Sequence, residues 1–263
     1  MPGGCWVCLL IDEQEVELLS ENRFSRMELL IGDEGLRRLT TASVAVFGVG
    51  GVGGYAVEAL ARAGVGRLTL VDFDVVALSN INRQIHALEG TVGRAKVQVM
   101  AERCRAINPA IRVEPLQEFY GADSAEVLLG RGFDQVLDCI DHITSKLHLI
   151  QSCKERGLPI ISSMGAANKL DPTKVAVADL FQTQKCRLAK ILRKELRKRG
   201  IESGVPVVYS TEEFRPLADA EGGTRRVTLG SSSYIPPIFG LIMAGEVIRG
   251  LLAKPACRGA NEI

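Results

Sequence analysis

Residues 44–53 read Val44-Ala45-Val46-Phe47-Gly48-Val49-Gly50-Gly51-Val52-Gly53, and this stretch decides the fold of the chain. The apolar run at its start is typical of a buried strand, and the glycines after it favour a tight turn. A small-residue helical pattern follows over 55–63, and a second β-branched run over 68–71 ends at Asp72. This order of strand, glycine turn, helix and strand predicts a unit whose backbone N–H groups and helix N-terminus bind phosphate.

A G-x-G-x-x-G pattern is a weak signal by itself in a chain with 27 glycines among 263 residues. Here it follows a strand, opens a helix and is followed by an acidic residue, Asp72, 24 positions after Gly48. In dinucleotide-binding folds such a carboxylate accepts hydrogen bonds from a ribose. We therefore expect a nucleotide site, and not glycines that only allow close helix packing. Its residues are Gly48, Gly50, Gly51, Gly53 and Asp72.

The composition is that of an ordinary globular chain. Apolar residues make up 46% and charged residues 24%, which is enough apolar content for one sizeable core. Lys and Arg number 32 against 31 Asp and Glu, so the overall charge indicates neither a nucleic-acid nor a membrane partner. The seven cysteines are odd in number and scattered, which favours a reducing, cytoplasmic location over a disulfide framework. The N-terminal segment lacks the basic and cleavage-site features of a signal peptide.

Strand and helix patterns alternate through the first two thirds of the chain. We expect strands at 111–116, 135–140 and 159–163, with helices at 124–129 and 145–156. Alternation of this kind implies right-handed crossovers in a Rossmann-like α/β fold, with a doubly wound and mostly parallel sheet. Ligands bind such sheets at the carboxyl ends of the strands.

The pattern changes in the last third. Strands are expected at 175–180, 205–210 and 226–229, as an antiparallel extension of the sheet, and a closing helix at 237–252. That helix is apolar but interrupted by charges, so we interpret it as a core or dimer-interface helix and expect no membrane span. We therefore predict one domain for residues 1–263. It comprises an N-terminal arm at 12–40, a nucleotide-binding core at 41–180, a basic helix insertion at 181–204, and C-terminal strands and helix at 205–255.

Charged side chains follow the core unit. Arg83 and Lys96 come after Asp72 within one strand-to-helix unit, where cations neutralise the charge of a triphosphate and of a departing pyrophosphate. Asp141 follows the strand at 135–140, and a carboxylate there suits the Mg²⁺ that accompanies ATP. Each of these alone is more often a solvated charge or a helix cap, and they indicate a site only in combination.

In combination these residues resemble a known family. The resemblance is carried by 48–53 and by the strings Asp72-Phe73-Asp74, Ser79-Asn80-Ile81-Asn82-Arg83-Gln84, Gly93-Arg94-Ala95-Lys96 and Asp138-Cys139-Ile140-Asp141. Over most of its first two thirds the chain is similar to the ThiF/MoeB/HesA superfamily, relatives of the ubiquitin-activating enzymes. The resemblance implies adenylation, in which a substrate carboxylate attacks the α-phosphate of Mg·ATP to give an acyl-adenylate and pyrophosphate.

The resemblance also implies roles for single residues and names ATP and Mg²⁺ as the cofactors. Asp141 would hold the metal ion. Arg26, in the string Arg23-Phe24-Ser25-Arg26, would reach the phosphates bound by the neighbouring protomer, which implies a homodimer. The nucleotide would be bound at its ribose by Asp72, at its phosphates by Asn80, Arg83 and Lys96, and beside these by Asp74 and Gln84.

The second half of the chain indicates which branch of this superfamily the chain resembles. Sulfur-carrier adenylating members usually have two C-x-x-C pairs there, and no such pair occurs after Cys8. Residues 160–167, 170–173 and 207–212 are instead similar to the tRNA threonylcarbamoyladenosine dehydratases. Members of that group activate the threonyl carboxylate of a modified adenosine beside the anticodon, and ring closure by the carbamoyl nitrogen releases AMP. Pro206-Val207-Val208 stand where some members have a cysteine.

A basic run covers 185–199, with eight cations and one acid. Leu188, Ile191, Leu192 and Leu196 form one apolar stripe at helical spacing, so the cations are expected on the outward face. A solvated helix is the usual meaning of such a run. In an otherwise neutral chain, however, this density favours contact with the tRNA backbone.

Other functions stay open at this point. One is adenylation of a sulfur-carrier or ubiquitin-like protein, with a sulfur-relay or sulfur-acceptor protein as a partner. An NAD-dependent oxidoreductase would use the same glycine turn but gives no role to Arg83, Lys96 and Asp141 together. A non-catalytic tRNA-binding scaffold would need only the basic run. AMP and pyrophosphate among the products would distinguish adenylation from the last two.

Overall fold

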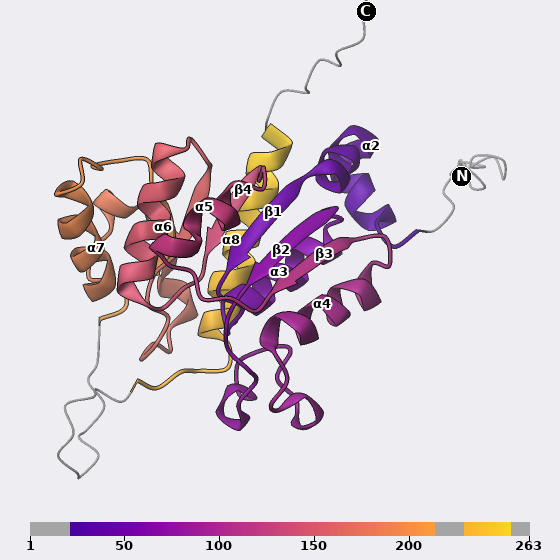
Figure 1. Cartoon of the computed structure of the whole chain (residues 1–263), viewed down its shortest axis with the longest axis horizontal. Coiled ribbons are helices and arrows are strands. Elements are labelled where there is room, and N and C mark those ends of the chain that lie inside the picture. Colours follow the sequence, from indigo (N-terminus) through magenta and orange to yellow (C-terminus); the bar gives the residue numbers. More distant parts are fainter. Residues whose placement is uncertain (1–21, 214–228, 254–263) are drawn as a thin grey trace, which may run out of the picture.

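The computed structural model describes residues 22–213 and 229–253 (Figure 1). Within these residues the chain forms a seven-stranded sheet in the order β3-β2-β1-β4-β5-β7-β6. Neighbouring strands pair in parallel except β6 and β7, which are antiparallel. The predicted Rossmann-like sheet with an antiparallel extension is therefore confirmed. The strands are β1 (Ser43–Phe47), β2 (Arg67–Val71), β3 (Arg112–Leu116), β4 (Gln135–Asp138), β5 (Ile160–Ser163), β6 (Val175–Asp179) and β7 (Pro206–Ser210).

Helices cover both faces of the sheet because successive β1 side chains point to opposite sides. Val44 and Val46 pack in one apolar core with α2, α3, α4 and α8. Ala45 and Phe47 pack in the other with α5, α6 and α7. Figure 1 shows α4 and α7 at opposite ends of the sheet. The helices are α2 (Ser25–Thr41), α3 (Gly53–Arg62), α4 (Lys96–Ile107), α5 (Ala122–Leu129), α6 (Ile143–Glu155), α7 (Arg187–Arg197) and α8 (Ile235–Ala253), with short 3₁₀ turns η1 (Leu78–Asn80), η2 (Glu89–Thr91), η3 (Pro172–Lys174) and η4 (Leu180–Gln182).

The glycine turn between β1 and α3 is as tight as the sequence predicts. Gly48 has φ of 87°, in the left-handed region that favours glycine. A Cβ atom added to Gly53 would lie 1.9 Å from the carbonyl oxygen of Gly48. The first turn of α3 can therefore approach the end of β1 only because both residues lack a side chain.

The closing helix α8 is a core helix. It is long and apolar enough for a membrane span by length and composition alone, but half of its most apolar window is buried within the protein. A Cβ atom on Gly240 would lie 2.2 Å from the carbonyl oxygen of Val52, so α8 packs closely against the start of α3. Phe239, Met243 and Val247 are buried in the shared core.

Some sequence predictions differ from the structure in detail. The strand expected at 135–140 ends at Asp138, and the helix expected at 145–156 begins at Ile143. The arm expected at 12–40 is represented by α2, which is kinked at Gly32, while residues 12–21 lie outside the described part. Most of the strand expected at 226–229 also lies outside it. The division of the chain into segments of one domain stays a prediction.

Candidate active site

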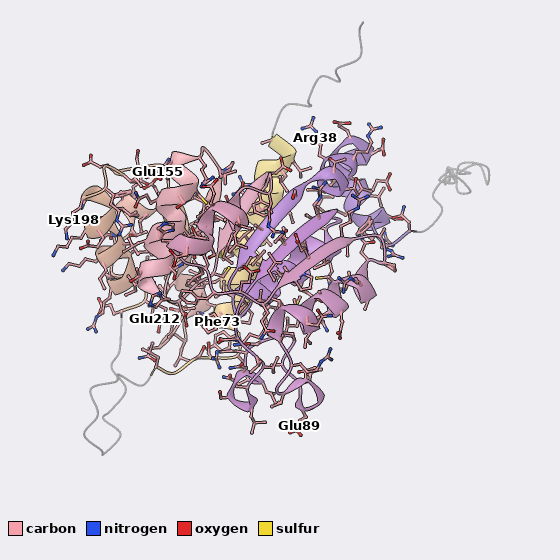
Figure 2. The ribbon with its side chains drawn as sticks, in the orientation of Figure 1. Arg38, Phe73, Glu89, Glu155, Lys198 and Glu212 are labelled. Carbon is pink, nitrogen blue, oxygen red and sulfur yellow. The ribbon has the colours of Figure 1, made fainter. Side chains whose placement is uncertain are left out.

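A cavity of about 840 Å³ opens at the carboxyl ends of the parallel strands. Its walls come from the glycine turn, from the residues that follow β2, β3, β4 and β5, and from the start of α7. Side chains at this edge include Phe73 and Glu212, which Figure 2 shows at the lower side of the molecule, opposite Arg38 on α2. The cavity brings together nine of the predicted site residues, namely Gly48, Gly50, Gly51, Asp72, Asp74, Arg83, Gln84, Lys96 and Asp141.

The carboxylate of Asp72 is held by the backbone of the glycine turn. One oxygen accepts a hydrogen bond from the N–H of Val49 at 2.6 Å, and the other from the N–H of Asp74 at 2.9 Å. Burial raises the pKa of Asp72, while the two N–H donors and the charge of Lys96 act in the opposite direction. The carboxylate is therefore oriented before any ligand binds, at the strand end where a ribose is expected.

Lys96 opens α4 and is almost completely buried. Its ammonium lies 2.6 Å from a carboxylate oxygen of Asp74, which is about half exposed. The ion pair holds the ammonium at the cavity wall, beside the N-terminus of α4. A phosphate there would meet both the lysine charge and the helix dipole.

The segment after β2 supplies further polar groups. Arg83 donates hydrogen bonds to the carbonyl oxygen of Ser79 and to the side chain of Asn82, both at 2.8 Å, which fix the guanidinium at the cavity. Gln84 is buried, and its Oε1 atom has no hydrogen-bond partner among the described residues. An unpaired buried polar atom is costly in a folded protein, so Gln84 is suited to a ligand.

Three predicted site residues do not line the cavity. Gly53 lies behind it, where it allows the close turn. Asn80 is buried on η1, and its side chain accepts a hydrogen bond from the N–H of Ala77 at 3.0 Å, so it orders the segment that carries Arg83. Arg26 is exposed on α2, next to the place where Arg23 donates to Asn108 at 3.3 Å. Asn108 follows the last turn of α4, about 18 Å from Lys96 along that helix.

Asp141 is exposed on the turn between β4 and α6. A buried network fixes this turn: Asp138 accepts from the ammonium of Lys146 at 2.7 Å, from the hydroxyl of Ser162 at 2.6 Å and from the N–H of Ile140 at 3.1 Å. No cluster of three metal-ligating side chains occurs in the described part of the chain. A single carboxylate fits a Mg²⁺ ion that arrives on nucleotide phosphates rather than a resident metal.

The cavity continues beyond Asp141 into a second region. This region is lined by residues that follow β5, by the start of α7 and by residues near Gly230. At the other end of the cavity, toward β2 and β3, an aromatic wall is formed by the rings of Phe73 and Phe119, which lie 5.3 Å apart, and by His142, whose ring lies 5.9 Å from Phe119. Sequence analysis missed Phe119 and Lys169 as cavity residues. Both could have been found from the sequence, because each follows a predicted strand. Lys169 also lies between the two strings at 160–167 and 170–173 that resemble the dehydratases.

The basic run forms α7, but two expectations about it were wrong. Ile191 is 44% exposed and does not belong to the buried stripe, which consists of Ala189, Leu192 and Leu196. Arg193 does not face outward. Its guanidinium donates to the carbonyl oxygens of Leu180 and Thr183 at 3.3 and 2.9 Å and to the Thr183 hydroxyl, because the η4 turn brings these oxygens against the helix.

The exposed face of α7 still carries cations. Lys190 and Lys194 are exposed and lie one turn apart, and neither side chain has a hydrogen bond or ion pair with a described residue. Arg197 lies over the ring of Phe181 at 5.4 Å. Cys186 precedes the helix, lines the cavity and accepts a weak hydrogen bond from the N–H of Ala189.

Comparison with known proteins agrees with this geometry. The model of the ThiF family matches residues 24–262. The tRNA threonylcarbamoyladenosine dehydratase of Bacillus subtilis is 45% identical over 241 residues, which cover 88% of this chain and 95% of the relative. The dehydratase of Escherichia coli is 37% identical over 257 residues, covering 90% and 96%. The crystal structure of the E. coli enzyme in complex with ATP superposes with a TM-score of 0.82 at 36% identity, over 90% of this chain and 96% of that one. The chain therefore belongs to the ThiF family.

Proposed function

We propose that this chain is an ATP-dependent tRNA threonylcarbamoyladenosine dehydratase. The observation that carries the proposal is a single cavity in which oriented nucleotide-binding groups and a second, cationic region meet at Asp141. The names of the similar proteins from B. subtilis and E. coli, and the ATP complex of the latter, support the same substrate and cofactor.

The reaction has two steps. In the first, an oxygen of the threonyl carboxylate attacks the α-phosphate of ATP, a new C–O–P linkage forms, and pyrophosphate leaves with the electron pair of the broken P–O bond. In the second, the carbamoyl nitrogen attacks the activated carbonyl carbon, its proton passes to solvent, and AMP leaves. The tRNA nucleoside has then lost the elements of one water molecule, and ATP has become AMP and pyrophosphate.

The residues of the nucleotide-binding half divide this work. Asp72 accepts from the ribose hydroxyls, and the glycine turn donates backbone N–H groups to phosphate oxygens. Arg83 and Lys96 stabilise the negative charge that grows on the leaving pyrophosphate. Asp141 holds Mg²⁺, which when bound polarises the phosphate oxygens and offsets their charge.

The proposal also includes a homodimer, in which each active site receives Arg26 from the neighbouring protomer. Arg26 lies three residues after Arg23, which contacts Asn108 at the end of α4, about 18 Å along that helix from Lys96. We therefore expect Arg26 to contribute to phosphate binding in the site of a neighbouring protomer. Leu29 and Leu30, on the same helix, are 67% and 80% exposed and give α2 an apolar surface for such a contact.

The experiment is reconstitution with purified protein, Mg·ATP and tRNA that carries threonylcarbamoyladenosine. We expect a nucleoside lighter by one water in mass spectra of the digested tRNA, with AMP and pyrophosphate formed in equal amounts. The matched control is the same tRNA without the modification, which should release no AMP. Failure to form AMP and the lighter nucleoside from the modified tRNA would overturn the proposal.

The same assay tests the remaining partners. The sequence leaves open whether a sulfur-relay or sulfur-acceptor protein assists, and adding such a protein to the assay measures whether it raises the rate. Adenylation of a sulfur-carrier protein remains the second candidate, because the molybdopterin-synthase adenylyltransferase of Salmonella typhimurium is 38% identical over 57% of this chain and 59% of the relative. AMP formed from a carrier protein but not from modified tRNA would favour it. A tRNA substrate also supports a cytoplasmic location.

A further inference from the structure

In the described part of the chain, three buried lysines lie at or just below the carboxyl edge of the sheet, and one of them differs from the others. Lys96 is paired with Asp74 at 2.6 Å and the fully buried Lys146 with Asp138 at 2.7 Å. Lys169, which is only 7% exposed, has no ion pair with any described residue. Its ammonium donates one hydrogen bond, to the main-chain carbonyl oxygen of Glu212 at 2.8 Å.

A buried ammonium without a carboxylate is unfavourable, because it has lost much of its hydration and gained no opposite charge. Lys169 lines the cavity, so its unused N–H groups are accessible to a ligand. Buried charges in folded proteins are generally paired. The partner of Lys169 is therefore expected to be an anion that enters the cavity.

The surrounding structure fixes Lys169 in this position. The N–H of Asn168 donates to the carbonyl oxygen of Gly230 at 2.9 Å, and the N–H of Gly230 donates to the side chain of Asn168 at 2.6 Å. On the other side, the carboxylate of Glu212 accepts from the N–H groups of Leu170 and Asp171. That carboxylate is thus used by the backbone, and only the carbonyl group of Glu212 reaches the ammonium.

The order of the strands indicates which anion this is. Along the sheet, β2 leads to Asp72, β1 to the glycine turn, β4 to Asp141 and β5 to Lys169. A nucleotide with its ribose at Asp72 and its phosphates between the glycine turn and Asp141 occupies the first three positions. Lys169 follows the next strand, β5, and contacts Glu212 after β7, so it lies on the side of Asp141 away from the ribose position. The substrate that supplies the attacking carboxylate is the anion that remains to occupy this part of the cavity.

We propose that Lys169 binds the carboxylate of the threonylcarbamoyl group and positions it for attack on ATP, an inference that rests on the proposed function. The ammonium donates to one carboxylate oxygen and leaves the other free to attack the phosphorus. Adenylation then removes the negative charge from the carboxyl group, so the interaction is strongest before the first step. Lys169 is a binding residue for the substrate and has no role in holding ATP.

The test compares Lys169→Met and Lys169→Arg with the wild type in the reconstituted reaction. A charged hydrogen bond of this kind corresponds to about a 10- to 100-fold change in affinity. We expect the Met variant to raise KM for modified tRNA by that factor, with KM for ATP and affinity for unmodified tRNA unchanged, and the Arg variant to recover part of the loss. Lys174→Met, at an exposed position on η3, is the matched control and should behave as wild type.

Each other outcome overturns the inference. Weaker binding of unmodified tRNA by Lys169→Met would assign the ammonium to a backbone phosphate, and a raised KM for ATP would assign it to the nucleotide. Unchanged kinetics would mean that no ligand uses it. Thermal melting checks the fold, and because the Met variant removes an unpaired buried charge we expect no loss of stability; if it does not fold, Lys169→Gln replaces it. Absence of product from the wild type would instead overturn the proposed function itself.

Discussion

The two halves of the cavity are built in different ways. In the nucleotide half, Asp72 is held by two backbone N–H groups and the ammonium of Lys96 by a carboxylate. These groups come from one continuous stretch, 48–96. The second half combines residues after β5, before α7 and near Gly230, and there Lys169 has only a carbonyl partner.

We infer from this difference that the nucleotide half binds the common cofactor, ATP, and that the second half recognises the particular substrate. In the nucleotide half Asp72 and Lys96 are oriented before ATP arrives, so their geometry costs little to organise on binding. The second half carries an unmatched charge and gains its partner only with the correct ligand. A ligand without the anion would leave that charge unpaired, which is a strong means of discrimination.

The largest expected effect is at the boundary of the two halves. Asp141→Ala should lower the rate of AMP formation by about 1000-fold or more, because it removes the carboxylate that we propose as the ligand of the Mg²⁺ of Mg·ATP. The exposed position predicts an unchanged melting temperature. AMP release is measured over a magnesium titration, with Asp123→Ala, an exposed acid on α5, as the control. Unchanged turnover would remove Asp141 from the site.

Variants of residues that bind phosphate in the nucleotide half test whether the protein acts as a homodimer. Arg26→Ala and Lys96→Ala are each expected to lower activity about 100-fold, because each removes a cation that binds phosphate. Mixing the two should restore about a quarter of the wild-type activity, since half of the dimers are mixed and one of their two sites is intact. Activity is measured after subunit exchange has been verified by mass spectrometry. A mixture no more active than its components would place the complete site within one chain.

Beyond the second half, the exposed face of α7 should contribute to tRNA binding. Reversing both Lys190 and Lys194 to Glu is expected to weaken tRNA affinity about tenfold and to leave KM for ATP unchanged. It should also make the slope of log affinity against log salt shallower by about two units, one for each phosphate that is no longer neutralised. Arg112→Glu, exposed on the opposite edge strand β3, is the control. An unchanged affinity and slope would mean that α7 only solubilises the protein.

The smallest effect on activity is expected behind the nucleotide half, at His86. The ring is 2% exposed, and neither nitrogen has a hydrogen-bond partner among the described residues. Burial, with the charges of Lys96 and Arg103, lowers the pKa of His86 to about 4. The unfolded chain therefore takes up the proton first as the pH falls below about 6.5, and this residue alone should cost about 2 kcal/mol of stability between pH 7 and pH 5.

Urea denaturation at the two pH values measures this. His86→Leu should lose about 2 kcal/mol less stability than the wild type on acidification and should keep its activity at neutral pH. An equal loss in both proteins would contradict the lowered pKa. Such a result would also show that the wall behind the nucleotide half is more hydrated than its geometry indicates.

The sequence predicted more residues of the nucleotide half of the cavity than of the second half, and the reason is physical. Glycine turns and strand-end carboxylates act through local backbone geometry, so Gly48, Asp72 and Asp141 could be located from their spacing alone. Lys169 is a candidate ligand-binding residue because no carboxylate pairs with its ammonium among the described residues. Which groups surround a side chain depends on the folded structure, so the sequence alone does not reveal it. Helical periodicity likewise placed Arg193 outward, whereas the carbonyl groups of η4 draw it inward.

The thiol of Cys186 makes the second half open to chemical labelling. Burial raises the pKa of Cys104 and Cys153 to about 12, so these buried thiols are almost entirely protonated and slow to alkylate. Cys186 is also mostly buried, but it lines the cavity at the N-terminus of α7, where a small reagent that enters the cavity reaches it. A substrate bound beside Lys169 would shield it from iodoacetamide, whereas ATP in the other half would not. The rate of alkylation at this one thiol, followed by peptide mass spectrometry, thus reports occupancy of the substrate region without any catalytic turnover.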